Sequence, residues 1–211
     1  MKRTLCIMGM CALSACALLS KAEPLVPRYF TPETGEAPVA PATAAREALR
    51  LRLGSVDSGS QLRERMMYRS ATHELGYYAD RRWSERPEAY LRRGLVRVLF
   101  EERGLFQVTS GLAPTLDAEL VAFEVLPSAQ PKVRVQVVIA MDDARSGKLS
   151  RTITVQQAVR SKGTSDDTDA EVEALGAALQ RCLTQVAEVV VDRLQVTAAR
   201  TTPDVTTNEI R

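Results

Sequence analysis

Strict alternation of apolar and polar residues predicts the strands of this chain. In residues 48–53 three leucines alternate with arginines, and in residues 132–141 an apolar residue stands at every second position from Val133 to Met141. Such alternation places the apolar residues on one face of an extended chain, which is the pattern of a half-buried strand. Weaker alternation and short apolar runs between turn residues predict further strands over residues 62–70, 74–79, 105–110, 118–126 and 148–158.

Two segments have apolar residues at helical spacing instead. The first begins at Pro87, which suits the first turn of a helix, and ends before Gly104, which suits a left-handed stop. The second begins at Thr168 and Glu171, which match the capping-box pattern, and carries one long apolar stripe. This order of elements predicts a single α+β domain over residues 46–196, a mainly antiparallel sheet with both amphipathic helices packed on one face.

Residues 1–15 have the build of a secretory signal peptide. Lys2 and Arg3 precede an apolar run from Leu5 to Leu13, and small residues lead to Cys16. The run is shorter than the roughly 20 residues that cross a bilayer. Its ending, L-S-A-C, resembles a bacterial lipobox, in which cleavage leaves an acylated Cys16 as the first residue of the mature chain. The alternative is an ordinary cleaved signal in which Cys16 is incidental.

The segments on either side of the domain differ from it in composition. Residues 16–45 hold five of the chain's ten prolines, which predicts an extended, semi-rigid tether behind the lipidated cysteine. Residues 197–211 are polar and predict a frayed tail. Loss of residues 1–15 removes Lys2 and Arg3 and lowers the formal charge from +2 to 0. The basic composition therefore does not indicate nucleic-acid binding.

The sequence offers little material for catalysis or for metal binding. His73 is the one histidine, and no nucleophile motif, phosphate-binding glycine loop or Cys-x-x-Cys pair accompanies it. Cys6 and Cys11 lie in the segment that is removed, which leaves Cys182 on the apolar face of the second helix, where a free thiol behaves as a small buried hydrophobe. We expect no enzyme activity, no cofactor, no metal and no disulfide within one subunit.

Arginine is concentrated in the first half of the domain. Residues 50–103 contain twelve arginines, eight acids and no lysine. One interpretation is a surface that meets anionic headgroups or an acidic partner, because guanidinium groups bind phosphates and carboxylates through two hydrogen bonds. The other is an arginine-rich composition on ordinary solvated faces. Trp83, between Arg82 and Arg86, suits an interface if it is exposed and the entrance of the first helix if it is buried.

Several motifs together resemble one known family. In residues 77–108 a tyrosine pair is followed six positions later by a tryptophan, then by a proline that opens a helix, and the segment closes with Gly-x-Phe. Downstream, L-D-A-E-L-V-A-F-E-V (116–125) and the hairpin D-D-A-R-S-G-K-L-S-R-T-I-T-V (142–155) fit the same family, and Y-F-T-P (29–32) resembles the remnant of its opening strand. In these features residues 28–195 resemble the ABC-type transport auxiliary lipoproteins.

This resemblance implies a partner of a lipid-handling ABC transporter. Members of the family accompany a permease, an ATPase and a carrier with mammalian-cell-entry domains that moves phospholipid between two membranes. The chain would then be a non-catalytic lipoprotein on the periplasmic face of the outer membrane that docks this carrier. Ala17 follows Cys16, where aspartate often retains lipoproteins on the inner membrane. The residues expected to contact partner or lipid are Tyr77, Tyr78, Arg81, Arg82 and Trp83.

Two other functions stay open at this point. A lipoprotein plug or assembly subunit of an outer-membrane β-barrel or secretin machine would have a similar small α+β domain and would copurify with a barrel protein. A periplasmic hydrolase would lose its activity on substitution of His73. Whether copies of the chain associate is also open.

Overall fold

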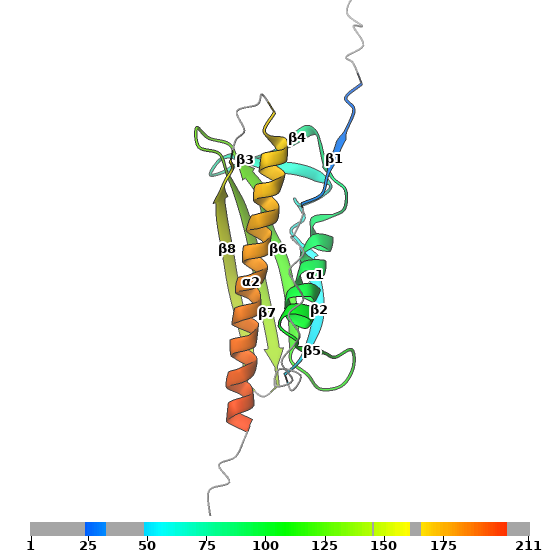
Figure 1. The fold of residues 1–211 in the computed structure, drawn as a ribbon, viewed down its shortest axis with the longest axis vertical. Coiled ribbons are helices and arrows are strands. Elements are labelled where there is room, and N and C mark those ends of the chain that lie inside the picture. Colours follow the sequence, from blue (N-terminus) through cyan, green and yellow to red (C-terminus); the bar gives the residue numbers. More distant parts are fainter. Residues whose placement is uncertain (1–23, 33–48, 145, 161–165, 202–211) are drawn as a thin grey trace, which may run out of the picture.

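The computed structural model describes residues 24–32, 49–144, 146–160 and 166–201, and shows two helices in front of a curved sheet (Figure 1). The predicted signal peptide and Cys16 lie outside the described residues. Eight strands and two main helices are present in the described residues, with a π-helical segment, η2, directly after the first helix. Their bounds are β1 Arg28–Phe30, β2 Arg50–Ser58, β3 Arg65–Ala71, β4 Glu74–Trp83, α1 Pro87–Val96, η2 Arg97–Glu102, β5 Phe106–Gln107, β6 Thr115–Leu126, β7 Lys132–Asp143, β8 Gly147–Ala158 and α2 Thr168–Thr201.

Strands β6, β7 and β8 form an antiparallel meander, as the alternation predicts. Val137 of β7 is in register with Leu120 of β6 and with Ile153 of β8, so these side chains share one face of the sheet. Val137 and Leu120 are completely buried. Gly147 begins β8 with a φ of 75°, a conformation that glycine adopts without strain.

The sheet is mixed, and the prediction of a mainly antiparallel sheet is wrong. Both β2 and β3 run parallel to β6 and follow one another along it: Ser58 of β2 is in register with Leu120, and Met67 of β3 with Glu124. Parallel neighbours need a long crossover, and α1 with η2 supplies it between the early strands and β6. The prediction of a single α+β domain is confirmed.

Two short strands complete the sheet at its margins. β1 runs parallel to β4, with Arg28 opposite Arg81 and Phe30 opposite Trp83. β5 pairs with the start of β2 and has two residues, where a strand over residues 105–110 was predicted. The expected strand is shortened because residues 109–114 form a loop, with Gly111 at a φ of 87°.

The first helix begins and ends where the sequence predicts, but its last turns widen. Pro87 occupies the first turn, and Gly104 follows the end with a φ of 64°. In η2 the N–H of Arg103 donates to the carbonyl of Val98, five residues earlier, at 3.1 Å. The wider turn brings Arg97 against Glu102, with 2.8 Å between guanidinium and carboxylate. It also keeps both Val98 and its neighbour Leu99 buried.

The start of α2 is held differently from the predicted capping box. In the predicted capping box, the hydroxyl of Thr168 would accept a hydrogen bond from an amide of the first turn. In the structure the carboxylate of Asp166 is the acceptor, and the N–H of Thr168 donates to it at 3.0 Å. Glu171 turns its carboxylate to Arg81 of β4, at 2.6 Å. The helix therefore begins at the predicted residue, but its first turn is tied to the sheet.

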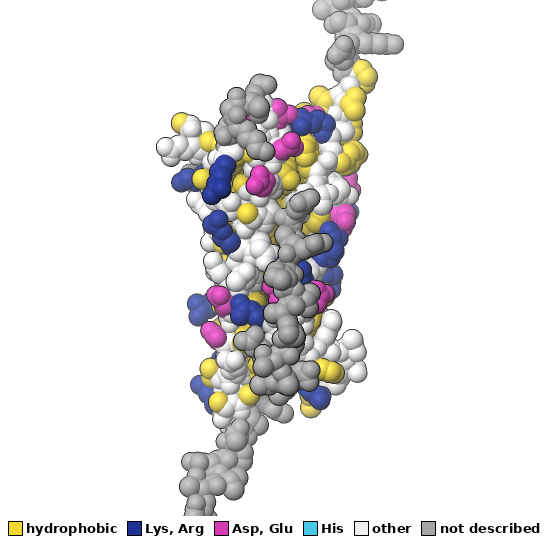
Figure 2. Space-filling view, viewed as in Figure 1, with side chains coloured by type: hydrophobic (Ala, Val, Ile, Leu, Met, Phe, Trp, Pro, Cys, Tyr) yellow, Lys and Arg dark blue, Asp and Glu magenta, His cyan; other side chains and the backbone are white. Residues whose placement is uncertain are grey.

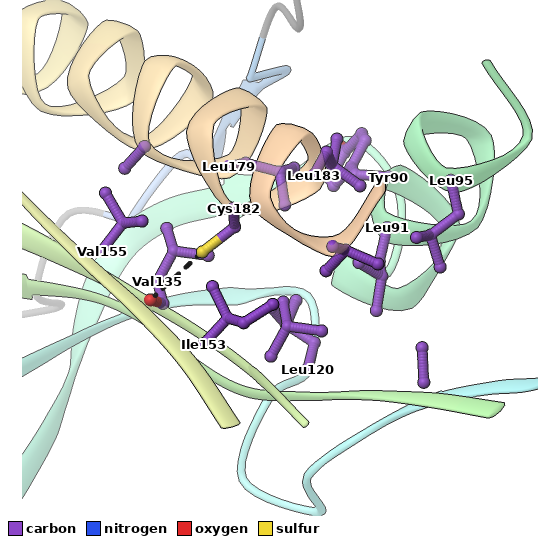
Figure 3. Close-up of a cluster of buried hydrophobic side chains, with 14 of the residues drawn as sticks. Tyr90, Leu91, Leu95, Leu120, Val135, Ile153, Val155, Leu179, Cys182 and Leu183 are labelled. Atoms are coloured by element: carbon purple, nitrogen blue, oxygen red, sulfur yellow. Dashed lines mark hydrogen bonds between the residues drawn. The ribbon is translucent and has the colours of Figure 1, made fainter. Parts of the chain in front are cut away.

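The core lies between the helices and the sheet (Figure 3). Cys182 points from α2 to β7, where its Sγ donates to the carbonyl of Val135 at 3.6 Å. Gly94 lets α1 approach α2, because a Cβ at this position would lie 2.3 Å from a methyl carbon of Leu183. Within the described residues, Thr168–Arg200 is long and apolar enough to cross a membrane, yet 61% of its most apolar window is buried in the fold. We interpret it as a core helix.

Candidate functional site

The five residues of β4 that the sequence suggested as contacts divide into two groups. The pairing of β3 with β4 is irregular: Arg65 is opposite Arg82, while Met67, two residues on, is opposite Tyr77. Between these two pairs, four residues of β4 (78–81) lie opposite a single residue of β3, Met66. This irregularity breaks the alternation of β4, so Tyr77 and Arg82 line the same surface hollow.

Trp83 belongs to the core. It is 2% exposed, with its ring centroid 4.9 Å from that of Phe123 and 6.2 Å from that of Tyr90. The structure thus selects the second of the two readings of this residue, the buried one at the entrance of the first helix. Its side chain offers no exposed contact surface.

Arg81 and Tyr78 join β4 to the start of α2. The Arg81 guanidinium lies 2.6 Å from the carboxylate of Glu171 and 3.5 Å from that of Asp166, and it stacks 4.0 Å from the ring centroid of Tyr78. Burial, with a smaller effect from the carboxylate of Glu171, raises the pKa of Tyr78 to about 12. These contacts satisfy Arg81 within the protein, so its role is to fix α2 on the sheet.

Arg82 and Tyr77 face the other way, into a hollow of about 430 Å³. We call it the arginine pocket, and its lining residues are Arg63, Glu64, Arg65, Tyr77, Arg82 and Arg86. Four arginines and one glutamate give the lining an excess of positive charge. Three of the four arginines were not singled out from the sequence, although they belong to the arginine-rich stretch that was.

The backbone around the arginine pocket is firmly held. The N–H of Trp83 donates to the carbonyl of Glu64 at 2.6 Å, and the hydroxyl of Tyr77 donates to the carbonyl of Gln61 at 3.0 Å. These bonds hold the segment before β3 against β4, and with it Arg63 and Arg65. The walls of the arginine pocket are therefore held in place by backbone hydrogen bonds of the fold.

A second pair of arginines, unlike Arg65 and Arg82, shares a buried carboxylate. Glu124 of β6 is completely buried, and one of its carboxylate oxygens accepts hydrogen bonds from Arg69, at 2.9 Å, and from Arg134. The aromatic-glutamate step of the sequence, Phe123-Glu124, is thus an internal ion-pair site: the phenylalanine packs on Trp83 and the glutamate holds two strands together.

The end of the fold formed by β5 and the last turns of α2 is apolar. Leu112 is 98% exposed, Phe106 is 52% exposed and Val196 is 46% exposed. Beside Leu112 lies a hollow of about 320 Å³, which is lined also by Arg50 and Arg52. This end is remote from β1, which lies at the opposite end of α2 (Figure 1).

The thiol and the imidazole among the described residues lie in contrasting environments. Burial raises the pKa of the Cys182 thiol to about 12, so the reactive thiolate is scarce at neutral pH. His73 is exposed in the turn between β3 and β4. Among the described residues no group of three or more His, Cys, Asp or Glu side chains could hold a metal ion.

The family model of the ABC-type transport auxiliary lipoprotein component matches residues 32–187. The chain belongs to this family. A crystal structure of a protein from Xanthomonas campestris shares the fold of this auxiliary lipoprotein: 21% sequence identity, 82% of this chain and 97% of that chain covered, and a TM-score of 0.62.

Two further solved structures are similar to the auxiliary lipoprotein. An uncharacterized protein has 14% identity, with 78% of this chain and 99% of that chain covered and a TM-score of 0.60. A minor lipoprotein from Acinetobacter baumannii has 13% identity, with 74% and 96% covered and a TM-score of 0.42. No curated protein matches the chain.

Proposed function

We propose that this auxiliary lipoprotein is a non-catalytic, periplasm-facing subunit of a mammalian-cell-entry type of ABC system for phospholipid transport between membranes. It is anchored to the outer membrane by lipid on Cys16 and docks the lipid carrier, which works with its own permease and ATPase. The observation that carries the proposal is the family match over residues 32–187, which begins 16 residues after the lipobox cysteine.

The apolar end of the fold supports docking at a distance from the anchor. α2 has 34 residues, which corresponds to about 50 Å of helix. The lipid-bearing segment enters at one end of this length, through β1, and Leu112 and Phe106 are exposed at the other. A carrier surface that is apolar and flanked by carboxylates matches these residues and the neighbouring Arg50 and Arg52.

The test is affinity capture of the lipidated protein from mildly solubilised membranes, with partners identified by mass spectrometry. We expect the mammalian-cell-entry carrier to be recovered with the wild type. Leu112→Asp should lower its recovery at least tenfold, because a charge then enters the centre of the apolar contact. Leu75→Asp is the matched control: Leu75 is 40% exposed on β4, away from this end, and its substitution should leave recovery unchanged.

Other results would assign a different role. Recovery of a β-barrel or secretin protein without the carrier would favour the plug or assembly subunit. Equal recovery of the carrier with Leu112→Asp and with wild type would show that the carrier docks on another surface. Chemical crosslinking in the same membranes shows whether several copies of the chain act together.

A further inference from the structure

The arginine pocket has more positive charge than the described residues around it compensate. Arg65 of β3 stands directly opposite Arg82 of β4 in the register of the sheet. Like charges directly opposite one another destabilise a sheet, whereas opposite charges stabilise it. Two adjacent strands therefore present their guanidinium groups together on the lining of one hollow.

The acids near the pocket leave this charge in place. Within the described residues neither Arg65 nor Arg82 has a carboxylate within 4.0 Å, and Glu64 forms no ion pair. Arg63 donates to the carbonyl of Ser60 at 3.3 Å, and Arg86 reaches Glu88 only at 3.9 Å. This differs from the other pair on the sheet, Arg69 and Arg134, which share the carboxylate of Glu124.

The chemistry of the lining selects a phosphate group. Several guanidinium groups around one hollow offer paired N–H donors to the oxygens of a single anion, and phosphate has enough oxygens to accept from more than one arginine. An anion bound between Arg65 and Arg82 would also screen the repulsion between their guanidinium groups.

The pocket is lined by β4, the strand that pairs with β1, and β1 is the first described strand after the proposed anchor at Cys16. Tyr29 of β1 is in register with Arg82, and Arg28, the first residue of β1, follows Cys16 by twelve residues, a reach of at most about 40 Å. Leu25, Val26 and Tyr29 of this segment are 60, 75 and 65% exposed. Figure 2 shows hydrophobic side chains gathered where this segment meets the fold. Exposed apolar residues beside unpaired arginines suit a layer of phospholipid headgroups.

We propose that the arginine pocket is a phosphate-binding site, and that a phospholipid headgroup at the anchoring membrane supplies its ligand. The phosphate chemistry stands on the pocket alone, whereas the lipid as its source rests on the proposed anchor at Cys16. The site is separate from the apolar docking end, so carrier recovery and phosphate binding can fail independently.

The experiment uses the full lipidated protein in a neutral detergent. Inorganic phosphate is titrated by calorimetry, and phosphatidylglycerol bound to the protein is counted by native mass spectrometry. We expect Arg65→Gln and Arg82→Gln each to weaken binding of the preferred probe at least tenfold, since each removes charge-assisted hydrogen bonds. Arg151→Gln is the matched control: it removes the same charge from an exposed strand position on β8 and should change nothing.

A thermal measurement separates loss of the site from loss of the fold. Without any anion, Arg65→Gln should melt at a temperature equal to or above that of the wild type, because it removes the repulsion with Arg82. Phosphate should then raise the melting temperature of the wild type and leave that of the variant unchanged.

The two probes distinguish the sources of phosphate. Binding of phosphatidylglycerol that depends on Arg65 supports a phospholipid headgroup as the ligand. If only inorganic phosphate binds, and its binding depends on Arg65, the phosphate site is supported and free phosphate replaces the lipid as the source of the ligand. The proposal is overturned if the wild type binds neither probe, or if binding is as strong in Arg65→Gln and Arg82→Gln as in wild type. Loss of carrier recovery in these variants without binding of either probe would also overturn it, in favour of an acidic protein partner.

Discussion

Asp166 is the residue on which three separate segments of the chain meet. Its carboxylate accepts hydrogen bonds from the N–H and hydroxyl of Thr168 in α2, and from Arg28 in β1 at 2.5 Å. Arg81 of β4 approaches the same carboxylate at 3.5 Å. One exposed carboxylate thus caps the long helix and ties the first strand and the sheet to it.

The hydrogen bonds from Thr168, followed by that from Arg28, hold the pKa of Asp166 well below its usual range. We predict that Asp166→Ala lowers the free energy of unfolding by about 1 kcal/mol at pH 7, which is the usual cost of a lost helix cap. A carboxyl with a lowered folded-state pKa stabilises the protein above its unfolded pKa, about 3.9. The difference from wild type should therefore shrink as the pH falls below about 4 toward the folded pKa.

Urea denaturation at pH 7 and at pH 3 measures this difference. Asp166→Asn is the control, because its amide oxygen can still accept from the N–H of Thr168 while the charge that attracts Arg28 is gone. It should lose less stability than Asp166→Ala at pH 7. A loss for Asp166→Ala that is the same at both pH values would contradict the role of the ionised carboxylate.

At the same scale, the arginine pocket shows what the sequence could indicate and what it could not. The excess of arginine over residues 50–103 was visible, and it allowed either an anion-binding surface or ordinary solvated faces. The convergence of Arg63, Arg65, Arg82 and Arg86 depends on the irregular pairing of β3 with β4, which no local pattern encodes. Trp83 stayed ambiguous for a related reason, since its burial is decided by Phe123, a residue forty positions away.

Among the elements, most strands and both main helices were predictable because each shows its burial in its own residues. Alternation placed β7 and β8 within two residues of their observed bounds, and Pro87 marked the start of α1. The partners of the strands were not predictable in this way. Alternation identifies the buried face of a strand, whereas the parallel pairing of β2 with β6 is decided by the packing of the crossover that joins them.

The contact between the two helices supports a prediction at this scale. Gly94 of α1 faces Leu183 of α2, where an added Cβ would lie 2.3 Å from one methyl carbon and 3.1 Å from the other. Leu183 is completely buried and has little space to move. We predict that Gly94→Ala lowers the free energy of unfolding by about 2 kcal/mol, because overpacking outweighs the gain in helix propensity of about 1 kcal/mol.

Chemical denaturation of a double-mutant cycle checks this. Leu183→Ala alone should destabilise the protein by about 3 kcal/mol through the cavity that it leaves. In the double variant the new methyl group enters that cavity, so the total loss should be smaller than the sum of the two single losses. Additive losses would show that the helices do not meet at this point.

At the scale of the whole molecule, the long axis of α2 separates two surfaces with different chemistry. The end with β1 carries the arginine pocket and the exposed residues Leu25, Val26 and Tyr29, and the other end carries Leu112 and Phe106. A protein anchored by lipid at the β1 end would present the other end away from the membrane. Which end faces a membrane depends on lipid at Cys16, which makes the state of that residue decisive.

The last prediction concerns Cys16 and the number of thiols in the mature chain. Cleavage before Cys16 removes Cys6 and Cys11, and acylation blocks Cys16, so the mature protein should carry a single titratable thiol, that of Cys182. This thiol should react with a disulfide reagent only in denaturant, since Cys182 is completely buried and its pKa is raised to about 12. The mass of the membrane-extracted protein should correspond to a chain that begins at Cys16 and carries lipid.

Cys16→Ala tests the same step from the other side. Without the cysteine the lipoprotein peptidase has no substrate, so the uncleaved chain should show three thiols in denaturant, those of Cys6, Cys11 and Cys182, and should not reach the outer-membrane fraction. Cys182→Ala is the matched control and should be processed, lipidated and sorted like the wild type, because that thiol lies in the core. A wild-type chain with two thiols and no lipid mass would mean ordinary signal cleavage with an incidental Cys16. The protein would then need another anchor to bring the arginine pocket to a membrane.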